Sequence, residues 1–335
     1  MQMAKQLVTT MSPLRWDAHA CLPLSQLCSV EPLLRYQQAG VHYLSLNIGM
    51  DLNPLAQILL SLAHFRAEIQ AHPKLCLAGS LKEIRQASQQ DYLNIAFDLE
   101  GALPLLDSPE MVYLYRDLGV RQMHLAYNRN NSVAGGCHDQ KQGLTKLGFN
   151  ILDAMNHAGI IVDCSHMSES ASLDLINHSR SPAVFSHANP QALVKHQRNI
   201  SNEQLKAIAL HQGVVCLNGV NLFLGEDKPT LDTFIDHICY VSEYVGVEHV
   251  GIGLDISFRQ DGIDDEPKQD FDPDYWWPKN AGYSEGIKQI RYLPVNTWTN
   301  LALALKMRGF TDQEVDLVLG ENMARVLARV EEVAQ

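Results

Sequence analysis

The sequence predicts an α/β fold, a (β/α)8 TIM barrel with a metal site at the C-terminal ends of its strands. Three observations support this prediction. Apolar runs rich in β-branched residues alternate with segments of helical period up to about residue 256, which is the order of a parallel sheet. The predicted strands number eight, as in this barrel. A polar side chain stands at the end of each one, and in this fold all strand ends meet at one mouth.

The elements follow one another regularly along the first three quarters of the chain. Strands are predicted over residues 16–20, 41–48, 93–100, 120–127, 160–166, 182–188, 213–219 and 249–255. A helix over 144–159 ends at Gly159, whose flexible backbone is typical of a helix stop. Another helix, over 201–213, begins at Ser201, which forms an S-x-x-Q capping box with Gln204.

The segment 258–294 interrupts this alternation. It is rich in Asp, Pro and aromatic residues and has no helical period. We expect a lid or loop insertion over the mouth that shapes substrate choice and supplies no metal ligand. Trp276 and Trp277 would either form an apolar wall for a substrate side chain or pack on the barrel rim. Two amphipathic helices, over 295–309 and 311–334, then close the fold.

Length and charge favour small-molecule chemistry in one domain. The 335 residues and the hydrophobic content of 46% suit a large buried core, so we expect a single domain over 1–335. The formal net charge of -12 argues against nucleic acid and against an anionic membrane surface, since both attract clustered Lys and Arg. The sequence leaves a homodimer open.

Cysteine usage and the N-terminal residues indicate a cytoplasmic protein. The seven cysteines include no CxxC pair and no spacing typical of a disulfide framework, so we expect them to be reduced. The first fifteen residues lack the apolar core of a signal peptide, and no stretch is long and apolar enough to span a membrane. These features predict a cytoplasmic location.

The strand ends carry the candidate chemistry. Their polar residues are His19, Asn47, Glu100, Tyr127 with Asn128, His166, His187, Asn218 and Asp255. Zinc binds imidazole nitrogen together with carboxylate oxygen, and a carboxylate such as Glu100 can bridge two ions ~3.5 to 4 Å apart. The joint placement of these residues at one mouth therefore favours a zinc site.

Each residue also has a structural alternative. A single His at a strand end is more often a hydrogen-bonded packing residue than a ligand. Asp255 would otherwise cap the next helix, and Glu100 would be an ion-paired barrel residue. For Asn47 and Asn218 we favour a role in satisfying the loop backbone. The remaining histidines on predicted helices and loops, such as His157, are expected to be surface residues.

Several longer motifs amount to a family resemblance. The segments GLTKLGFNILDAMNHAGIIVDCSHMSES, SPAVFSHANPQAL, HQRNISNEQLKAIA and HVGIGLD resemble the membrane dipeptidase (renal dipeptidase) family of zinc peptidases. The resemblance runs from about Trp16 to the C-terminal ENMARVL. It implies an α/β barrel with two zinc ions that cleaves dipeptides and tolerates a D-residue at the C-terminal position.

The resemblance also implies residue roles. His19 would bind one zinc ion, Glu100 both, and His166 and His187 the other. The family's Arg that grips the substrate carboxylate corresponds to Arg198. Its acidic residue that faces the substrate amine and the attacking water corresponds to Asp255.

Two departures from the family pattern affect the site. Cys21 stands where the family has an Asp that binds the same zinc as the preceding His. A Cys21 thiolate is a sound zinc ligand, but the replacement equally allows a weak or empty second site, or a Cys that only packs. Tyr127 stands where the family usually has a His that contacts the substrate carbonyl. Its hydroxyl can donate to the developing oxyanion, with a different reach.

The predicted activity is zinc-dependent hydrolysis of dipeptides by hydroxide generated on the metal, with Asp255 transferring the proton to the leaving amine. Asp255, Glu100 and Tyr127 are the predicted catalytic residues, and Arg198 restricts the substrate to short peptides. Two alternatives remain open: an amidohydrolase acting on N-acyl amino acids or lactams, and a metal-poor binding protein without catalysis. The retention of Glu100, His166 and Asp255 argues against the last.

Overall fold

A computed structural model describes residues 12–139, 141–263, 267 and 271–334. Parts of two predicted regions lie outside these residues, namely 1–11 at the N-terminus and 264–266 and 268–270 in the lid segment. Among the described residues, none of the helices has the length and apolar character needed to cross a membrane.

A closed parallel β-barrel forms the centre of the molecule, as the sequence predicts. Neighbouring strands pair in the order β1, β2, β4, β5, β6, β7, β8, β9, and β9 pairs back with β1 to close the ring. The eight barrel strands are β1 (Trp16–Cys21), β2 (Tyr43–Met50), β4 (Leu93–Glu100), β5 (Val120–His124), β6 (Ile161–Asp163), β7 (Val184–Phe185), β8 (Val214–Leu217) and β9 (Val250–Ile252). Two short strands were not predicted: β3 (Leu75–Leu77), which pairs with β4, and β10 (Ile256–Ser257), which pairs with β1.

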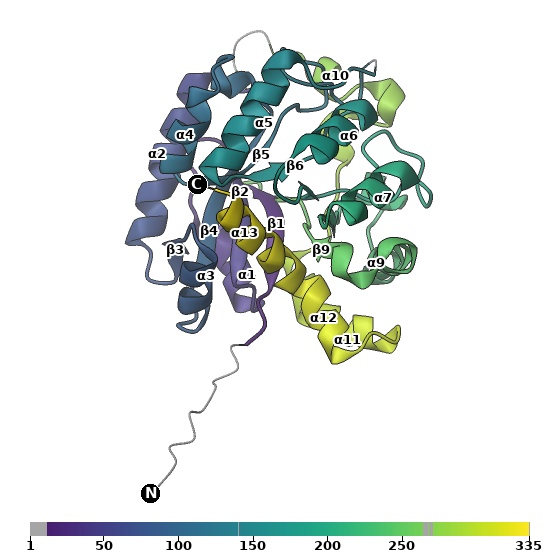
Figure 1. The fold of residues 1–335 in the computed structure, drawn as a ribbon. Coiled ribbons are helices and arrows are strands. Elements are labelled where there is room, and N and C mark those ends of the chain that lie inside the picture. The colour runs from purple at the N-terminus through teal and green to yellow at the C-terminus, as the bar shows by residue number, and fades with distance from the viewer. Residues whose placement is uncertain (1–11, 140, 264–266, 268–270, 335) are drawn as a thin grey trace, which may run out of the picture.

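Helices surround the strands. Figure 1 shows α2, α3 and α4 on one side of the barrel and α5, α6, α7 and α9 on the other, with α13 crossing in front of the strands. The helices are α1 (Leu34–Gln38), α2 (Leu55–Ala71), α3 (Leu81–Ser88), α4 (Glu110–Asp117), α5 (Lys146–Ala158), α6 (Glu169–His178), α7 (Asn202–Leu210), α8 (Asn221–Leu224), α9 (Leu231–Val245), α10 (Pro273–Trp276), α11 (Trp298–Met307), α12 (Asp312–Asp316) and α13 (Asn322–Val333).

The predicted end of α5 and the predicted start of α7 are confirmed, whereas α7 ends at Leu210, before the predicted end at 213. The chain leaves α5 at Gly159, which has φ 69°, the left-handed conformation that favours glycine. Helix α7 begins after Ser201, and the side chains of Ser201 and Gln204 satisfy each other's backbone N–H groups. Local sequence therefore determines these two boundaries.

The prediction of one helix over 311–334 is wrong. The chain forms α12, a π-helical turn over Leu317–Glu321, and then α13. Gly320 lies against the start of the barrel, where a Cβ atom would stand 2.4 Å from the Leu14 carbonyl oxygen. The break brings Glu321 to the same place, and its Oε1 accepts the Leu14 N–H at 2.8 Å. Contact with a distant segment thus interrupts the helical pattern.

Helix α13 closes the barrel end opposite the C-terminal ends of the strands. Its apolar residues, including Met323 and Leu327, join one buried cluster with inward-facing residues of the strands, including Trp16 of β1 and Cys216 of β8. The other main cluster contains residues on the outer faces of the strands and the helices that pack on them. Helix α13 thus covers the N-terminal ends of the strands, and the predicted site residues lie at the opposite end.

A bulge in β1 sets the direction of its last side chains. Between Asp17 and Ala20 the register of β1 against β2 shifts, because β1 has one residue more than the facing stretch of β2. Such an extra residue reverses which side chains face inward. Trp16 faces the inner cluster, Asp17 accepts a hydrogen bond from the outer Trp298 indole at 3.0 Å, and His19 then points into the barrel.

Candidate metal centre and substrate pocket

Glu100 is the centre of the residues at the mouth. It is the last residue of β4, and its Oε1 lies 3.0 Å from His166 Nε2, 3.4 Å from His187 Nε2 and 3.6 Å from His19 Nε2. This oxygen is buried and has no hydrogen-bond partner. A buried carboxylate oxygen without a donor is unfavourable unless a cation binds it. The arrangement therefore fits a metal bound between the carboxylate and the imidazoles.

Three groups of residues could each hold a metal ion, because the ligand atoms within each group lie within 4.8 Å of one another. One comprises His19, Cys21 and Glu100, and a second comprises Glu100, His166 and His187. The two share Glu100, as two neighbouring ions bridged by one carboxylate require. The predicted ligand residues are thus brought together by the fold, Cys21 included, with its Sγ 3.5 Å from His19 Nε2.

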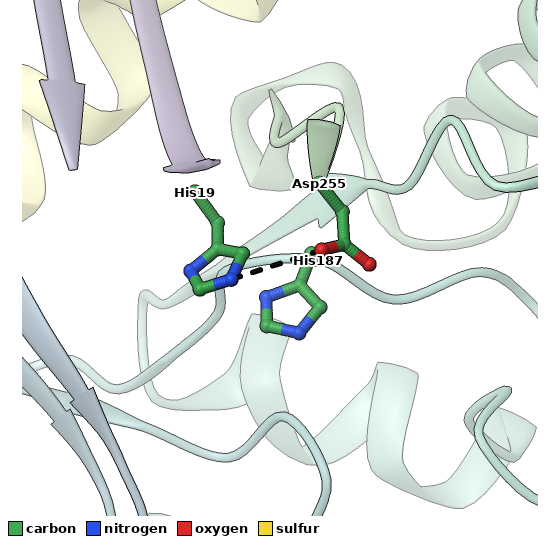
Figure 2. Close-up of side chains that lie close together, drawn as sticks. All are labelled: His19, His187 and Asp255. Atoms are coloured by element: carbon green, nitrogen blue, oxygen red, sulfur yellow. Dashed lines mark ion pairs between the residues drawn. The ribbon is translucent and has the colours of Figure 1, made fainter. Parts of the chain in front are cut away.

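The third group joins both halves of the site. Figure 2 shows the His19 and His187 rings side by side, with the Asp255 carboxylate directed toward them. The rings stack with centroids 4.2 Å apart, and His19 Nε2 lies 3.7 Å from Asp255 Oδ1. Asp255 therefore faces the space where ions and substrate would meet.

Each candidate imidazole ligand is held from behind. A ligating His usually engages its second ring nitrogen with an oxygen, which fixes the ring and its tautomer. His166 Nδ1 hydrogen-bonds Asn128 Oδ1 at 2.7 Å and His187 Nδ1 hydrogen-bonds Ser186 Oγ at 2.7 Å, whereas His19 Nδ1 lies at an ion-pair distance of 3.3 Å from Asp98 Oδ1 without a hydrogen bond. All three leave Nε2 directed toward the mouth.

Three site residues adopt a left-handed backbone conformation. Asn128, His166 and Asp255 have φ of 59°, 65° and 58°. Non-glycine residues rarely adopt this region, although Asn, Asp and His tolerate it best. Each of them lies in the loop that follows a strand, where the left-handed backbone turns the chain. Strands β5, β6 and β9 end at His124, Asp163 and Ile252, three or four residues before these positions, so the predicted strands to 127, 166 and 255 were too long.

Burial sets the protonation of the site without metal. It raises the pKa of Glu100 to about 7, although His19 and His124 oppose the shift. Burial, reinforced by nearby cationic groups including Arg198, lowers the pKa of His166 and His187 well below the usual value. Both imidazoles are therefore neutral, as metal ligands must be, and their Nε2 atoms lie 2.8 Å apart in a hydrogen bond that a metal ion would replace.

The Cys21 thiol, in contrast to these imidazoles, keeps its proton. Burial raises the pKa of its thiol to about 12, although His19 opposes the shift. A cysteine in this environment is protonated at neutral pH and becomes a thiolate only when a cation replaces the proton. Its participation therefore depends on the metal itself.

Arg198 and Asp255 line one cavity of about 600 Å³, into which His166 also opens. Arg198 is only 3% exposed, its Nε has no hydrogen-bond partner, and its Nη2 reaches the His187 carbonyl oxygen at 3.4 Å. Among the residues described here, no carboxylate forms an ion pair with it. A buried guanidinium in this state is suited to an anionic ligand.

Tyr127 lies on the wall of this cavity. Its hydroxyl oxygen accepts a hydrogen bond from Trp277 Nε1 at 3.2 Å, and its ring stacks on His166 with centroids 4.4 Å apart. The Tyr127 N–H donates to Asp51 Oδ2 at 3.0 Å. Because the indole N–H occupies the oxygen as an acceptor, the phenol proton remains available for a ligand.

A match to a family model identifies the family of this chain. The model of the membrane dipeptidase family (peptidase family M19) matches residues 32–272. The chain belongs to this family. The match includes Glu100, His166, His187 and Arg198 but begins after His19 and Cys21.

The sequence and the structure of the chain are each similar to known proteins over most of its length. The dipeptidase tcpJ of Claviceps purpurea is 29% identical over 240 residues, which cover 70% of this chain and 50% of that protein. The chain thus spans about half the length of the curated relatives it matches. A crystal structure of an amidohydrolase from Pseudomonas aeruginosa superposes with a TM-score of 0.81 and 26% identity, covering 95% of this chain and 96% of the other.

A more distant structure supports the same fold. A metallo peptidase from Rhodobacter sphaeroides, liganded with a phosphinate mimic of the dipeptide L-Ala-D-Ala, has a TM-score of 0.76 and 19% identity, covering 95% of this chain and 100% of the other. At that identity the likeness concerns the barrel alone.

His124 is a residue of the site in this membrane dipeptidase fold that was not predicted from the sequence. It is the last residue of β5, its Nε2 lies 2.6 Å from Asp163 Oδ2, and its Nδ1 faces Glu100 Oε1 at 3.8 Å without a hydrogen bond. Burial disfavours the charged form, but Asp163 more than compensates and raises the pKa of His124. The sequence signal for His124 was its position two residues after Gln122 in a predicted strand, because this spacing places both polar side chains on the inward face.

The asparagines behave largely as expected, whereas the expectation that the remaining histidines lie on the surface is wrong for His138 and His237, which are buried. Asn47 bonds the backbone of Gly49 with both its oxygen and its nitrogen. Asn218 accepts the Val220 N–H at 2.7 Å, but it also donates to Asp255 Oδ2 at 2.9 Å and so orients a site residue. His157 is exposed on α5.

Proposed function

We propose that this chain is a metal-dependent dipeptidase that binds two zinc ions through His19, Cys21, Glu100, His166 and His187. The observation that carries the proposal is the Glu100 oxygen, buried, without a donor, and faced by imidazole nitrogens of three different strand ends. Nitrogen, carboxylate oxygen and sulfur together suit a borderline-soft ion such as Zn²⁺ better than Mg²⁺ or Ca²⁺.

The chain's own residues position the substrate and move the proton. Zinc, when bound, supplies Lewis acidity at the scissile carbonyl and lowers the pKa of water. Arg198 binds the free C-terminal carboxylate, which restricts substrates to those whose C-terminus lies next to the scissile bond. Asp255 receives the substrate amine and carries the proton from the attacking water to the leaving nitrogen. Tyr127 donates its phenol proton to the carbonyl oxygen.

Asp255 favours a dipeptide over the amidohydrolase alternative. Its side chain is 19% exposed, and burial raises its pKa, although His19, Arg198 and the Asn218 amide stabilise the carboxylate. A free ammonium group would pair with this carboxylate, whereas an N-acyl group or a lactam brings no positive charge to it. The complete ligand set also argues against a metal-poor binding protein.

We also propose one domain with a lid over 258–294. Described residues of this segment, including Phe258, Trp277 and Tyr283, line the cavity, and no residue of the segment belongs to the described ligand groups. The segment is therefore placed to influence substrate choice.

Metal analysis combined with a substrate panel tests the function. The purified protein should contain zinc, lose activity with a chelator and regain it with zinc. Dipeptides with L- or D-alanine at the second position should be hydrolysed, and their N-acetyl derivatives should not. Hydrolysis of N-acetyl amino acids but not of dipeptides would favour the amidohydrolase alternative, and full activity after complete metal removal would exclude the metal role.

A further inference from the structure

The large cavity is wider than the proposed reaction needs. Its volume of about 600 Å³ lies within the range of ~300–1,000 Å³ typical of sites for drug-sized ligands. A dipeptide of two small residues, held between Arg198 and Asp255, would leave much of it unfilled. Space of this kind in a substrate pocket normally receives a substrate side chain.

One part of the cavity wall is apolar and aromatic, while polar residues that include Asn53, Gln260 and Lys288 line the rest. Six buried residues form a separate hydrophobic cluster, and partly buried apolar residues of the lid segment, of the end of β2 and of the loop after it extend this cluster. The six are Tyr127, Val220, Phe223, Trp277, Ala281 and Tyr283, and the additional residues include Met50, Leu52, Phe271, Ile287, Ile290 and Tyr292. Such a surface favours an apolar group of the ligand.

The apolar wall extends to the Asp255 end of the site. Phe258 follows Asp255 closely in sequence and lines the cavity together with Ile290 and Tyr292. Tyr292 and Asp255 line the same cavity. The substrate residue whose amine binds Asp255 therefore lies against this wall.

The Arg198 end has different surroundings. The guanidinium carbon already lies 5.4 Å above the Phe223 ring. A second, smaller cavity of about 230 Å³ meets the large one at His166 and Arg198, and Ser165, Gln197 and Gln204 are among the polar residues that line it. The C-terminal residue of a dipeptide would sit at this junction, beside polar groups.

We propose that the preferred substrates are dipeptides with a bulky apolar first residue, whose side chain fills the large cavity. This inference rests on the proposed dipeptidase function and specifies its substrate class. The first residue is selected because its amine is fixed by Asp255 at the apolar end. Burying a large apolar side chain there raises kcat/KM for Phe-Ala about 10- to 100-fold over Ala-Ala.

Three dipeptides measure the preference on the zinc-loaded protein. We expect kcat/KM to be highest for Phe-Ala, lower for Ala-Phe and lowest for Ala-Ala, because only the first position reaches the apolar wall. Equal values for Phe-Ala and Ala-Ala would overturn the inference while leaving the dipeptidase function intact. No hydrolysis of any of the three by the loaded protein would instead refute the dipeptidase function on which the inference rests.

A charge placed on the wall provides the second test. Ile287 is partly buried in the lid segment and lines the cavity. Ile287→Asp should lower the ratio of kcat/KM for Phe-Ala over Ala-Ala about tenfold and raise the ratio for Lys-Ala, because a carboxylate disfavours an apolar side chain and attracts an ammonium group. An unchanged Phe-Ala ratio would contradict the assignment of this wall.

The matched control is Leu303→Asp. Leu303 is 63% exposed on α11 and does not line the cavity. This variant carries the same change of charge and should retain the wild-type ratios. A shift in both variants would attribute the effect to net charge and overturn the inference.

Discussion

Replacing Arg198 with Lys is expected to lower kcat/KM for dipeptides while leaving the zinc content unchanged. Arg198 is 3% exposed and forms no ion pair within the described part of the chain, so the substrate carboxylate would be its charged partner. The Lys ammonium keeps the positive charge but loses the planar two-pronged geometry. None of the predicted metal ligands is altered.

The magnitude follows from the number of hydrogen bonds lost. A bond to a charged group contributes ~1.5–3 kcal/mol, so the loss of one of two prongs lowers kcat/KM by about 10- to 150-fold. The wild type should discriminate between a dipeptide and its C-terminal amide by a factor in the same range, since the amide is neutral and leaves the buried guanidinium without an anion.

The assay compares steady-state kcat/KM for a dipeptide and its C-terminal amide in the wild type and in Arg198→Lys, with zinc measured in each preparation. The preference for the free acid should shrink in the variant. Arg308→Lys is the control, because Arg308 forms an exposed ion pair with Asp236. If the wild type hydrolyses acid and amide equally well, no carboxylate is bound by Arg198 and the reasoning is wrong.

Four further substitutions test the site. His187→Ala should remove bound zinc and lower kcat by at least ~10³-fold, because the metal provides both the polarised carbonyl and the activated water; full activity with zinc retained would refute the metal assignment. Cys21→Asp should raise zinc occupancy and activity if the thiol leaves its site partly filled, since a carboxylate oxygen donates less electron density to the ion than a thiolate sulfur and so lowers its Lewis acidity less. A crystal structure with two full-occupancy zinc ions and the Cys21 sulfur beyond bonding distance of both would argue against our preference for a thiolate-bound or partly filled site. His124→Ala should weaken zinc binding in competition with a chelator, because the Nδ1 atom faces Glu100 at 3.8 Å; unchanged affinity would mean that His124 only packs. Trp277→Ala removes the donor to Tyr127 and part of the cavity wall, so the order of preferred dipeptides should change, and an unchanged order would mean that the indole only packs on the rim.

The sequence determined the barrel and the residue types at its mouth. Alternating apolar runs and helical segments require a parallel sheet, and a parallel sheet delivers its strand ends to one edge. His19, Glu100, His166 and His187 could therefore be placed near one another without coordinates. The Ser201 capping box and the Gly159 stop were equally predictable, because both depend on interactions within a few residues.

The tertiary structure decided how those residues face. His19 points inward because a bulge in β1 adds one residue against β2, and His124 approaches Glu100 because Asp163 of the neighbouring strand holds its ring. Likewise, the break at Gly320 depends on contact with Leu14 at the far end of the chain. A local pattern specifies which residues belong to a strand or helix. The direction of each histidine side chain depends on strand register. The partner of the second ring nitrogen is distant in sequence for His19 and His124, and only the folded chain brings the two together.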